Sequence, residues 1–355
     1  MIRRFKSSLS AVLAFVMAVT FTFGAAFGAS MVPGVYVKAS AVSSTENYTA
    51  STYYPKTDAF LNSSVSKSAK VLNNCWEYMM AWIRFVTGNS SASYTEFPSY
   101  SNPAEVLPGD VIQIQGHWLV VLDCQASGDT IKLRTAEGNW PNGSYTVGNG
   151  IYTVSGNVLK RNGSASRPFK KGYHIITSFY NAAKTCVDSN FYPAMYPDIK
   201  NAYGSNYSSL FTHYMVHGIG EGRVASPSYD VGYYLSANND VKKTYGSNNR
   251  QAFYHYVTYG IFEKRTSSRF YNGSFYIGRY SDLSRAFGTS GKSFISAAQH
   301  FNSNGVNEHR QGISSFSVEA YRNNYSDLQK AFSNHWLDYF IHYLQHGLKE
   351  GRKTT

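Results

Sequence analysis

Four residues in the first half of the chain have the types and the order that hydrolysis by a cysteine nucleophile would need. Cys75 opens a run with helical character, His117 precedes an apolar strand-like run, and Glu137 and Asn139 close a third element. A thiol attacks only as the thiolate, and both a helix start and a nearby imidazole lower its pKa. A third group must fix the tautomer of the imidazole. Glu137 suits that role, and Asn139 falls on the same side of a strand.

The residues beside this set are candidates for binding the substrate or stabilising the oxyanion. Each member of the set is ordinary on its own, because a cysteine at a helix start is usually structural and a histidine in a strand usually belongs to the core. The combination, in this order, favours chemistry over structure. The flanking candidates are Asn74, Trp76, Trp118 and Trp140.

Three local motifs resemble those of the CHAP family, the cysteine, histidine-dependent amidohydrolases/peptidases of bacterial walls. The motifs are Asn74-Cys75-Trp76, Pro108-Gly109-Asp110 leading into Gly116-His117, and Glu137-Gly138-Asn139-Trp140, and the resemblance covers about residues 73–176. It implies a papain-like α+β fold with Cys75 as nucleophile, His117 as base, and Glu137 and Asn139 orienting that base. The family more often has Gln where Asn74 stands here. The N-terminal segment lacks the acidic calcium-binding loop of some members, so we expect no metal and no cofactor.

The first 41 residues have the features of an export signal. A positive start with Arg3 and Arg4 precedes an uncharged apolar stretch over residues 9–27, and Ala39-Ser40-Ala41 supplies a small-residue cleavage site. A membrane anchor is the alternative, because the stretch is long enough to span a bilayer. Helix-breaking residues ahead of the cleavage site favour a cleaved signal. We therefore expect a secreted protein, extracellular or wall-associated, with no stable membrane anchor after cleavage.

Charge and cysteine content narrow the classes of partner. The formal net charge is +12, and removing the four basic residues of the signal leaves +8 on the mature chain. The surplus is spread along the chain, so we expect no nucleic acid and favour an anionic wall polymer, with solubility alone as the alternative. Three cysteines make no disulfide framework. A Cys124–Cys186 bridge stays open, and Cys75 would then be the free thiol.

Patterning divides the mature chain into a first domain, a linker and an array. Residues 42–180 mix one helix-like run with short β-rich runs broken by Gly, Pro and Asn, and about 140 residues suffice for one compact domain. Residues 181–190 are polar and weakly patterned, and we expect a linker there. The remainder repeats with a period of 42 residues. The four copies cover about 191–226, 227–268, 269–313 and 314–355.

The copies share residues at the same spacing, with Ser333 in place of the first Gly in the last copy, and this pattern predicts a short helical hairpin that stacks on its neighbours. The shared Asp suits a helix N-cap, and two shared glycines suit left-handed C′ positions. A second His at i+4 occurs in only two copies, so a packed histidine is favoured over a metal ligand. The closing Glu and Arg are favoured as an internal ion pair. The shared positions are, in the first copy, Tyr192, Asp198, Gly204, His213, Gly218, Glu221 and Arg223.

The array resembles the Tyr/His/Gly–Glu-Gly-Arg repeats of about 40 residues in secreted and surface proteins of Gram-positive bacteria. Together these features predict an α+β papain-like hydrolase domain followed by an all-α helical-hairpin array. The expected function is a secreted peptidoglycan hydrolase, an N-acetylmuramoyl-L-alanine amidase or a peptidoglycan endopeptidase, whose repeats attach it to the wall. The alternatives are a secreted cysteine peptidase that acts on proteins and a non-catalytic surface-binding protein.

Overall fold

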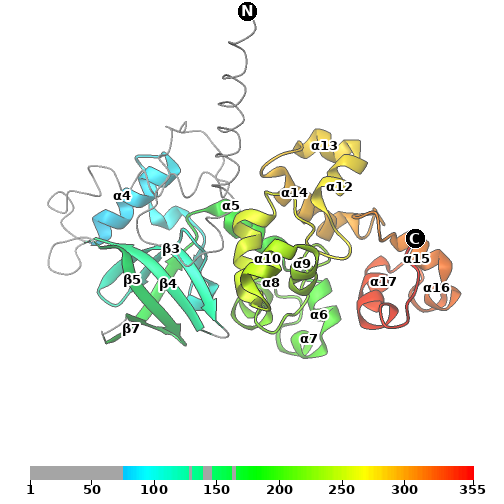
Figure 1. The fold of residues 1–355 in the computed structure, drawn as a ribbon, viewed down its shortest axis with the longest axis horizontal. Helices are drawn as coiled ribbons and strands as arrows, with labels where there is room; N and C mark the ends of the chain where they lie inside the picture. The colour runs from blue at the N-terminus through cyan, green and yellow to red at the C-terminus, as the bar shows by residue number, and fades with distance from the viewer. Residues whose placement is uncertain (1–74, 128–129, 139–145, 162–164) are drawn as a thin grey trace, which may run out of the picture. The chain divides into compact units, whose positions relative to one another are not determined.

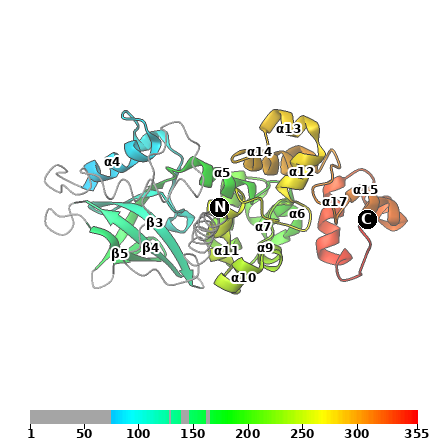
Figure 2. The ribbon, with the colours of Figure 1, turned by 45° about the horizontal axis from the view of Figure 1, so that its top comes forward.

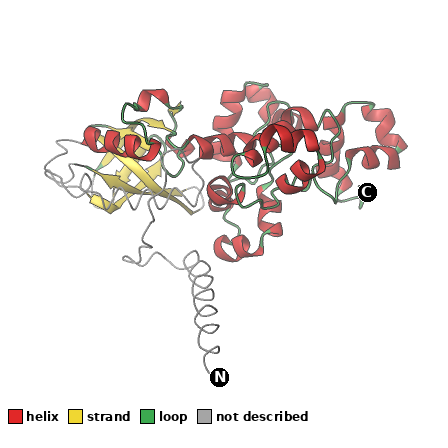
Figure 3. Ribbon diagram, turned by 90° about the horizontal axis from the view of Figure 1, so that it is seen from above, coloured by secondary structure: helices red, strands yellow, loops and turns green. Residues whose placement is uncertain are grey.

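The chain places its strands first and most of its helices after them (Figure 1, Figure 3). The computed structural model describes residues 75–127, 130–138, 146–161 and 165–355. All of these belong to one unit that spans residues 39–355. In the part of the chain so described, no helix is both long and apolar enough to cross a bilayer. The predicted signal peptide lies outside the described residues.

Seven strands within the described residues form one antiparallel sheet. Its order is β1-β7-β2-β3-β4-β5-β6, and β6 also pairs with β7. That last pairing closes β2 to β7 into a six-stranded barrel, with β1 added beside β7. The strands are β1 (Ser99–Tyr100), β2 (Val111–Ile114), β3 (His117–Ser127), β4 (Thr130–Glu137), β5 (Thr146–Ser155), β6 (Val158–Arg161) and β7 (Ser166–Tyr173).

The expected papain-like α+β fold is therefore wrong, and a closed antiparallel barrel takes its place. The closure rests on the pairing of β6 with β7, in which Val158 lies opposite Pro168 and Leu159 opposite Arg167. Closing the sheet removes the free edges that an open sheet would leave. This closure was not predictable from the sequence, because the segment that forms β6 and β7 is rich in Lys, Arg, Ser and Gly and carries no clear alternation.

Helix α4 (Cys75–Thr87) packs across β3 and β4 (Figure 2). Its apolar side is buried and includes Tyr78, Trp82 and Ile83. Tyr78 lies against Gly138, where an added Cβ would collide with the Tyr78 side chain. This glycine lets the first turn of the helix approach the end of β4. Two short 3₁₀ turns, η1 (Tyr94–Glu96) and η2 (Pro103–Glu105), follow the helix.

The segment 181–190, expected as a linker, contains the end of a packed helix. Helix α5 (Thr177–Thr185) contacts η4 (Tyr256–Gly260) and α14 (Ser293–His300) of the repeats, and Ala182 and Ala183 are fully buried. The helical core thus begins before the first repeat. Cys186, directly after α5, and Cys124 of β3 are both buried free thiols, so the structure contains no bridge between them.

The C-terminal region is helical, but the prediction of one hairpin per copy is wrong. Each copy has three short α-helices followed by one turn of π-helix. The first helix ends because the chain turns extended before the second, with φ and ψ of −133° and 109° at Tyr196 and of −123° and 86° at Asn238. The elements are α6 (Phe191–Met195), α7 (Pro197–Tyr203), α8 (Tyr207–His213) and η3 (Tyr214–Gly218); α9 (Val231–Ala237), α10 (Asn239–Tyr245), α11 (Asn249–His255) and η4; α12 (Gly273–Arg279), α13 (Ser281–Phe287), α14 and η5 (Phe301–Gly305); and α15 (Val318–Asn324), α16 (Ser326–Phe332), α17 (Trp336–His342) and η6 (Tyr343–Gly347).

The two shared glycines of each copy have different causes. Gly204 has a positive φ of 55°, as expected for a left-handed helix end, and Ser333 takes this conformation in the last copy with a φ of 51°. Gly218 does not. It sits in the π-helical turn, where the hydroxyl of Tyr192 occupies the space that a Cβ would need. The same close approach recurs in the other copies at Gly260, Gly305 and Gly347.

The closing Arg of each copy forms the predicted ion pair and a second one. Arg223 contacts Glu221, Nε to Oε2 at 2.5 Å, and Asp198, Nη1 to Oδ2 at 2.8 Å. Asp198 lies in the first turn of α7 and pairs with Arg223 from there. The N-cap of α7 is Tyr196 and not the predicted Asp198. The equivalent pairs recur in all four copies. These residues hold each copy together rather than form a site.

Candidate active site

Helix α4 and two neighbouring barrel strands bring the predicted nucleophile, base and carboxylate together. Cys75 is the first residue of α4, His117 the first of β3 and Glu137 the last of β4. Strands β3 and β4 pair with Val120 opposite Ala136. Continuing this register places Glu137 opposite residue 119, and His117 lies two residues further along the same face. The pleat thus puts imidazole and carboxylate side by side.

His117 bridges the thiol and the carboxylate. Its Nε2 lies 3.1 Å from Oε2 of Glu137, and the ring also forms a hydrogen bond with Cys75. Since Nε2 faces Glu137, Nδ1 is the nitrogen left for the thiol. The carboxylate accepts from Nε2–H and so favours the tautomer whose Nδ1 takes a proton from Cys75. His117 is only 5% exposed and Glu137 is fully buried.

The pKa values of the pair are displaced in the directions that a thiolate–imidazolium pair needs. Burial by itself would raise the pKa of the Cys75 thiol, but the hydrogen bond and charge of His117 outweigh it and bring the pKa below its usual value. The backbone N–H groups of Trp118 and Cys75 act in the same direction. Burial would lower the pKa of His117, yet its hydrogen bonds to Cys75 and Glu137 raise it. The start of a 13-residue helix adds a favourable dipole for the thiolate.

Glu137 is held as a buried anion by three further side chains that the sequence analysis missed. Thr135 donates to Oε1 at 2.8 Å, the hydroxyl of Tyr152 donates to Oε2 at 3.0 Å, and Nη1 of Arg161 lies 3.8 Å from Oε2. Burial would raise the pKa of Glu137, but His117, Thr135 and Arg161 lower it overall. Thr135 could have been found, because it lies two residues before Glu137 on the same strand face. Tyr152 and Arg161 could not, since their place depends on the register of β5 and β6.

A cleft of about 370 Å³ opens over the thiol and the imidazole. Trp76 stands in its wall with 43% of its surface exposed. Trp118 is mostly buried instead, with its ring centroid 5.1 Å from that of Tyr94. Gln113, another residue that the sequence analysis missed, lies opposite Trp118 on β2 and also lines the cleft. The remaining lining residues are Ile114 and Gly116.

Five of the eight predicted site residues come together in the described structure. Cys75, Trp76, His117 and Trp118 line the cleft, and Glu137 lies behind His117. The other three, Asn74, Asn139 and Trp140, lie outside the described residues. No group of three or more His, Cys, Asp or Glu side chains within the described ranges is arranged to hold a metal ion.

The Pro-Gly-Asp motif has a structural place. Asp110 accepts from the backbone N–H of Leu107 at 2.8 Å and lies 3.1 Å from Nδ1 of His174. Both side chains are buried, and the His174 ring is stacked between Tyr100 and Tyr180. Neither residue of this second histidine–carboxylate pair lines the cleft at Cys75, so the pair supports the barrel rather than the reaction.

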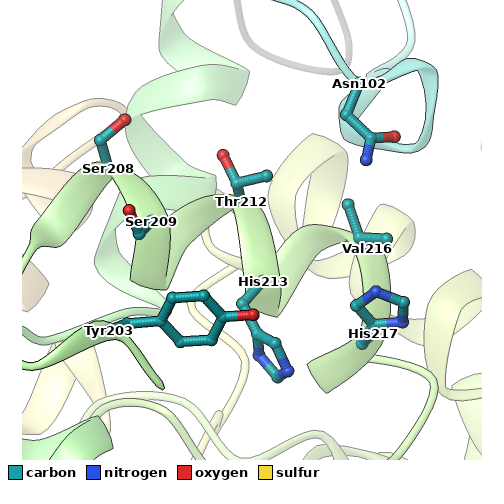
Figure 4. Close-up of a pocket in the computed structure, with 8 residues that line it drawn as sticks. All are labelled: Asn102, Tyr203, Ser208, Ser209, Thr212, His213, Val216 and His217. Carbon is teal, nitrogen blue, oxygen red and sulfur yellow. The ribbon is translucent and has the colours of Figure 1, made fainter. Parts of the chain in front are cut away.

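A second cavity, of about 290 Å³, has a different character (Figure 4). Tyr203, Thr212, His213 and His217 of the first repeat lie around it (Figure 4). The described residues of its lining include no thiol and no carboxylate, and Nδ1 of His213 is already engaged by the hydroxyl of Tyr192 at 2.9 Å. Of the two cavities, the cleft at Cys75 is the one equipped for nucleophilic chemistry.

Comparison with known proteins identifies no relative whose function could be compared with this site. No protein-family model, curated protein or solved structure matches the chain. The evidence for a function therefore consists of the thiol, the imidazole and the carboxylate, together with the local sequence motifs around them.

Proposed function

We propose that the protein is a secreted cysteine hydrolase that cleaves amide bonds of peptidoglycan. The observation that carries the proposal is the Cys75–His117–Glu137 arrangement at an open cleft, with the thiol pKa lowered and the imidazole pKa raised. Perturbed groups that share a cleft and complementary roles are typical of active sites. The expected resemblance to the CHAP family stays a prediction based on the local motifs.

The proposed reaction has two halves. The Cys75 thiolate attacks the amide carbonyl carbon, and the carbonyl electrons move to its oxygen. His117 gives the proton on Nδ1 to the leaving nitrogen as the C–N bond breaks, which leaves a thioester. Water then attacks the thioester while His117 takes its proton, and the C–S bond breaks to release the acid and restore the thiolate. Glu137 stabilises the imidazolium whenever it forms.

The substrate class is supported by features outside the reacting set. The wide cleft with an exposed Trp76 suits a polymer that stays partly outside the site. The mature chain is basic, which favours an anionic wall over a neutral surface. We further propose that the repeats attach the enzyme to the wall, since several weak sites on one array raise local concentration by avidity.

A pair of zymograms tests the reaction and its substrate together. The full chain and its Cys75→Ala variant are run on gels that contain bacterial walls or casein. The proposal expects clearing of the wall gel by the full chain alone. Clearing of casein but not of walls would favour a peptidase that acts on proteins, and no clearing of either would favour a non-catalytic surface-binding protein. Labelling the amines released from soluble wall fragments then separates an amidase from an endopeptidase.

The attachment role needs its own test. Because α5 packs into the helical core, a cut after Ile176 keeps that core together better than a cut within the helix. The fragment 177–355 should sediment with intact walls, less so as salt rises, and should not cleave them. Equal sedimentation of the full chain and of a chain that ends at Ile176 would mean that the repeats have another partner.

A further inference from the structure

The carboxylate behind the catalytic histidine belongs to a network that crosses four neighbouring strands of the barrel. His117 lies on β3, Glu137 on β4, Tyr152 on β5 and Arg161 on β6. Tyr152 and Arg161 are directly opposite each other in the β5–β6 register. The strands therefore deliver a hydroxyl and a guanidinium to the same carboxylate oxygen, Oε2, that His117 uses.

We propose that Tyr152 and Arg161 are positioning residues of the active site, which keep Glu137 charged and oriented and thereby maintain the Cys75 thiolate. The catalytic importance of these residues rests on the proposed function, but their effect on the ionisation of the Cys75 thiol does not. It assigns a role to two residues that touch neither the cleft nor the thiol. Their effect reaches Cys75 through Glu137 and then His117.

Arg161 offsets the free-energy cost of burying a carboxylate. Glu137 is fully buried, and a buried anion without a counter-charge would take up a proton. His117 cannot serve as that counter-charge before the thiol has given up its proton. Arg161, whose side chain is 15% exposed, is permanently charged and lies 3.8 Å from Oε2. It supplies the positive charge in advance.

Tyr152 fixes the orientation of the Glu137 carboxylate and adds no charge to it. Its hydroxyl donates to Oε2 at 3.0 Å while Thr135 donates to Oε1 at 2.8 Å, so both carboxylate oxygens are fixed. Burial, and then the neighbouring Glu137, raise the already high pKa of the Tyr152 phenol further, so Tyr152 stays a neutral donor through the working range. A carboxylate held at both oxygens holds the imidazole ring toward Cys75.

Among the described residues, the charged and titratable groups around this carboxylate and its histidine come from one helix and three strands. Helix α4 contributes Cys75, and Tyr78 beside Gly138; β3 contributes His117, β5 Tyr152 and β6 Arg161. Removing a positive charge from this set raises the pKa of each acidic group in it, so the thiolate should form at higher pH. This sign does not depend on how the protons are shared between thiol and imidazole.

The test follows alkylation of Cys75 by iodoacetamide against pH in the full chain, with the adduct located by mass spectrometry. Because Cys124 and Cys186 are fully buried, Cys75 should be the fast site. In Arg161→Met the acid limb of the profile should move to higher pH by about half a unit to one unit. Arg161→Lys should keep the profile close to that of the wild type, because it keeps the charge. Tyr152→Phe should move the limb in the same direction by less.

The matched control is Arg167→Met, which removes the same charge from a half-buried arginine on the neighbouring strand β7, whose Nη1 donates to the backbone carbonyl of Gln115. It should leave the profile unchanged. Superposition of the Arg161→Met profile on that of the wild type would overturn the proposal, as would equal shifts in Arg161→Met and Arg167→Met. If Arg161→Met does not fold, Tyr152→Phe decides, and an unchanged profile in that variant overturns the proposal. Absence of wall hydrolysis would refute the proposed function but leave this measurement intact.

Discussion

The barrel and the repeats use histidine in opposite ways. His117 faces a carboxylate and a thiol, and its pKa is raised. In each repeat the histidine Nδ1 faces the hydroxyl of a tyrosine of its own copy at 2.8–2.9 Å, and its pKa is lowered by burial. A carboxylate stabilises the imidazolium, whereas a neutral hydroxyl does not offset the cost of burying it. The partner, not the residue type, therefore decides whether a histidine is fit for acid–base chemistry.

The largest expected effect separates the cleft from the core. Cys75→Ala should abolish amide hydrolysis, because Cys75 is the nucleophile among the described residues that line the cleft. Cys124→Ala, the matched loss of a thiol from the barrel interior, should keep most of the turnover even if it lowers stability. Turnover on a soluble stem-peptide fragment measures both. Equal losses in the two folded variants would remove the assignment of Cys75.

Replacing one histidine from each region should give opposite signatures. His117→Ala should lower kcat by about 10²–10⁴-fold, because it removes the proton acceptor. His255→Ala should leave kcat nearly unchanged and lower the melting temperature, because Tyr234 loses its partner at 2.8 Å. Kinetics and thermal melts of both variants check the contrast. A similar loss of kcat in both would contradict the separation of the two regions.

The loss of kcat in Glu137→Gln should fall between the losses in His117→Ala and His255→Ala. The neutral amide keeps the shape but removes the charge that supports the imidazolium, so the Cys75 pKa should rise. At an assay pH below the thiol pKa, a rise of one unit in that pKa lowers the thiolate fraction about tenfold. The loss should therefore be smaller than that of His117→Ala and should shrink as the assay pH rises. A loss that stays constant with pH would point to misfolding rather than to charge.

The smallest effects concern stability against pH, where the two kinds of histidine have opposite signs. His255 has a folded pKa of about 4 against about 6.5 when unfolded, so the unfolded chain binds more protons between these values and acidification should destabilise the repeats. His117, with a raised pKa, contributes stability that is present below its unfolded pKa and is lost as pH rises through the folded one. Thermal melts at pH 7 and pH 5 test this. His255→Gln should reduce the acid sensitivity, and no change would contradict it.

Local features of the barrel were predictable, and its closure was not. The helix from Cys75, the strand over 111–114 and the pairing of His117 with Glu137 follow from short patterns in which neighbours along the chain decide the outcome. The papain-like expectation failed because β6 and β7 pair through a polar stretch whose register no local pattern reveals. Tyr152 and Arg161 were missed for the same reason.

The repeats teach a similar lesson at shorter range. The period, the internal ion pair and the packed histidine were readable because the same positions recur in every copy. The number of helices was not, because one extended residue, Tyr196 in the first copy, breaks an otherwise continuous apolar pattern. Gly218 was explained wrongly, since its need comes from the hydroxyl of Tyr192, which lies 26 residues earlier in the chain.

Trapping the acyl-enzyme tests the central claim most directly. The full chain is mixed with a soluble stem-peptide fragment, quenched in acid within the first turnovers and digested for mass spectrometry. The account predicts that the peptide containing Cys75 gains the mass of the acyl part of the substrate as a thioester, which hydroxylamine removes, and that His117→Ala shows none. Turnover by the wild-type chain at full rate with an unmodified Cys75, and equal turnover by Cys75→Ala, would contradict it.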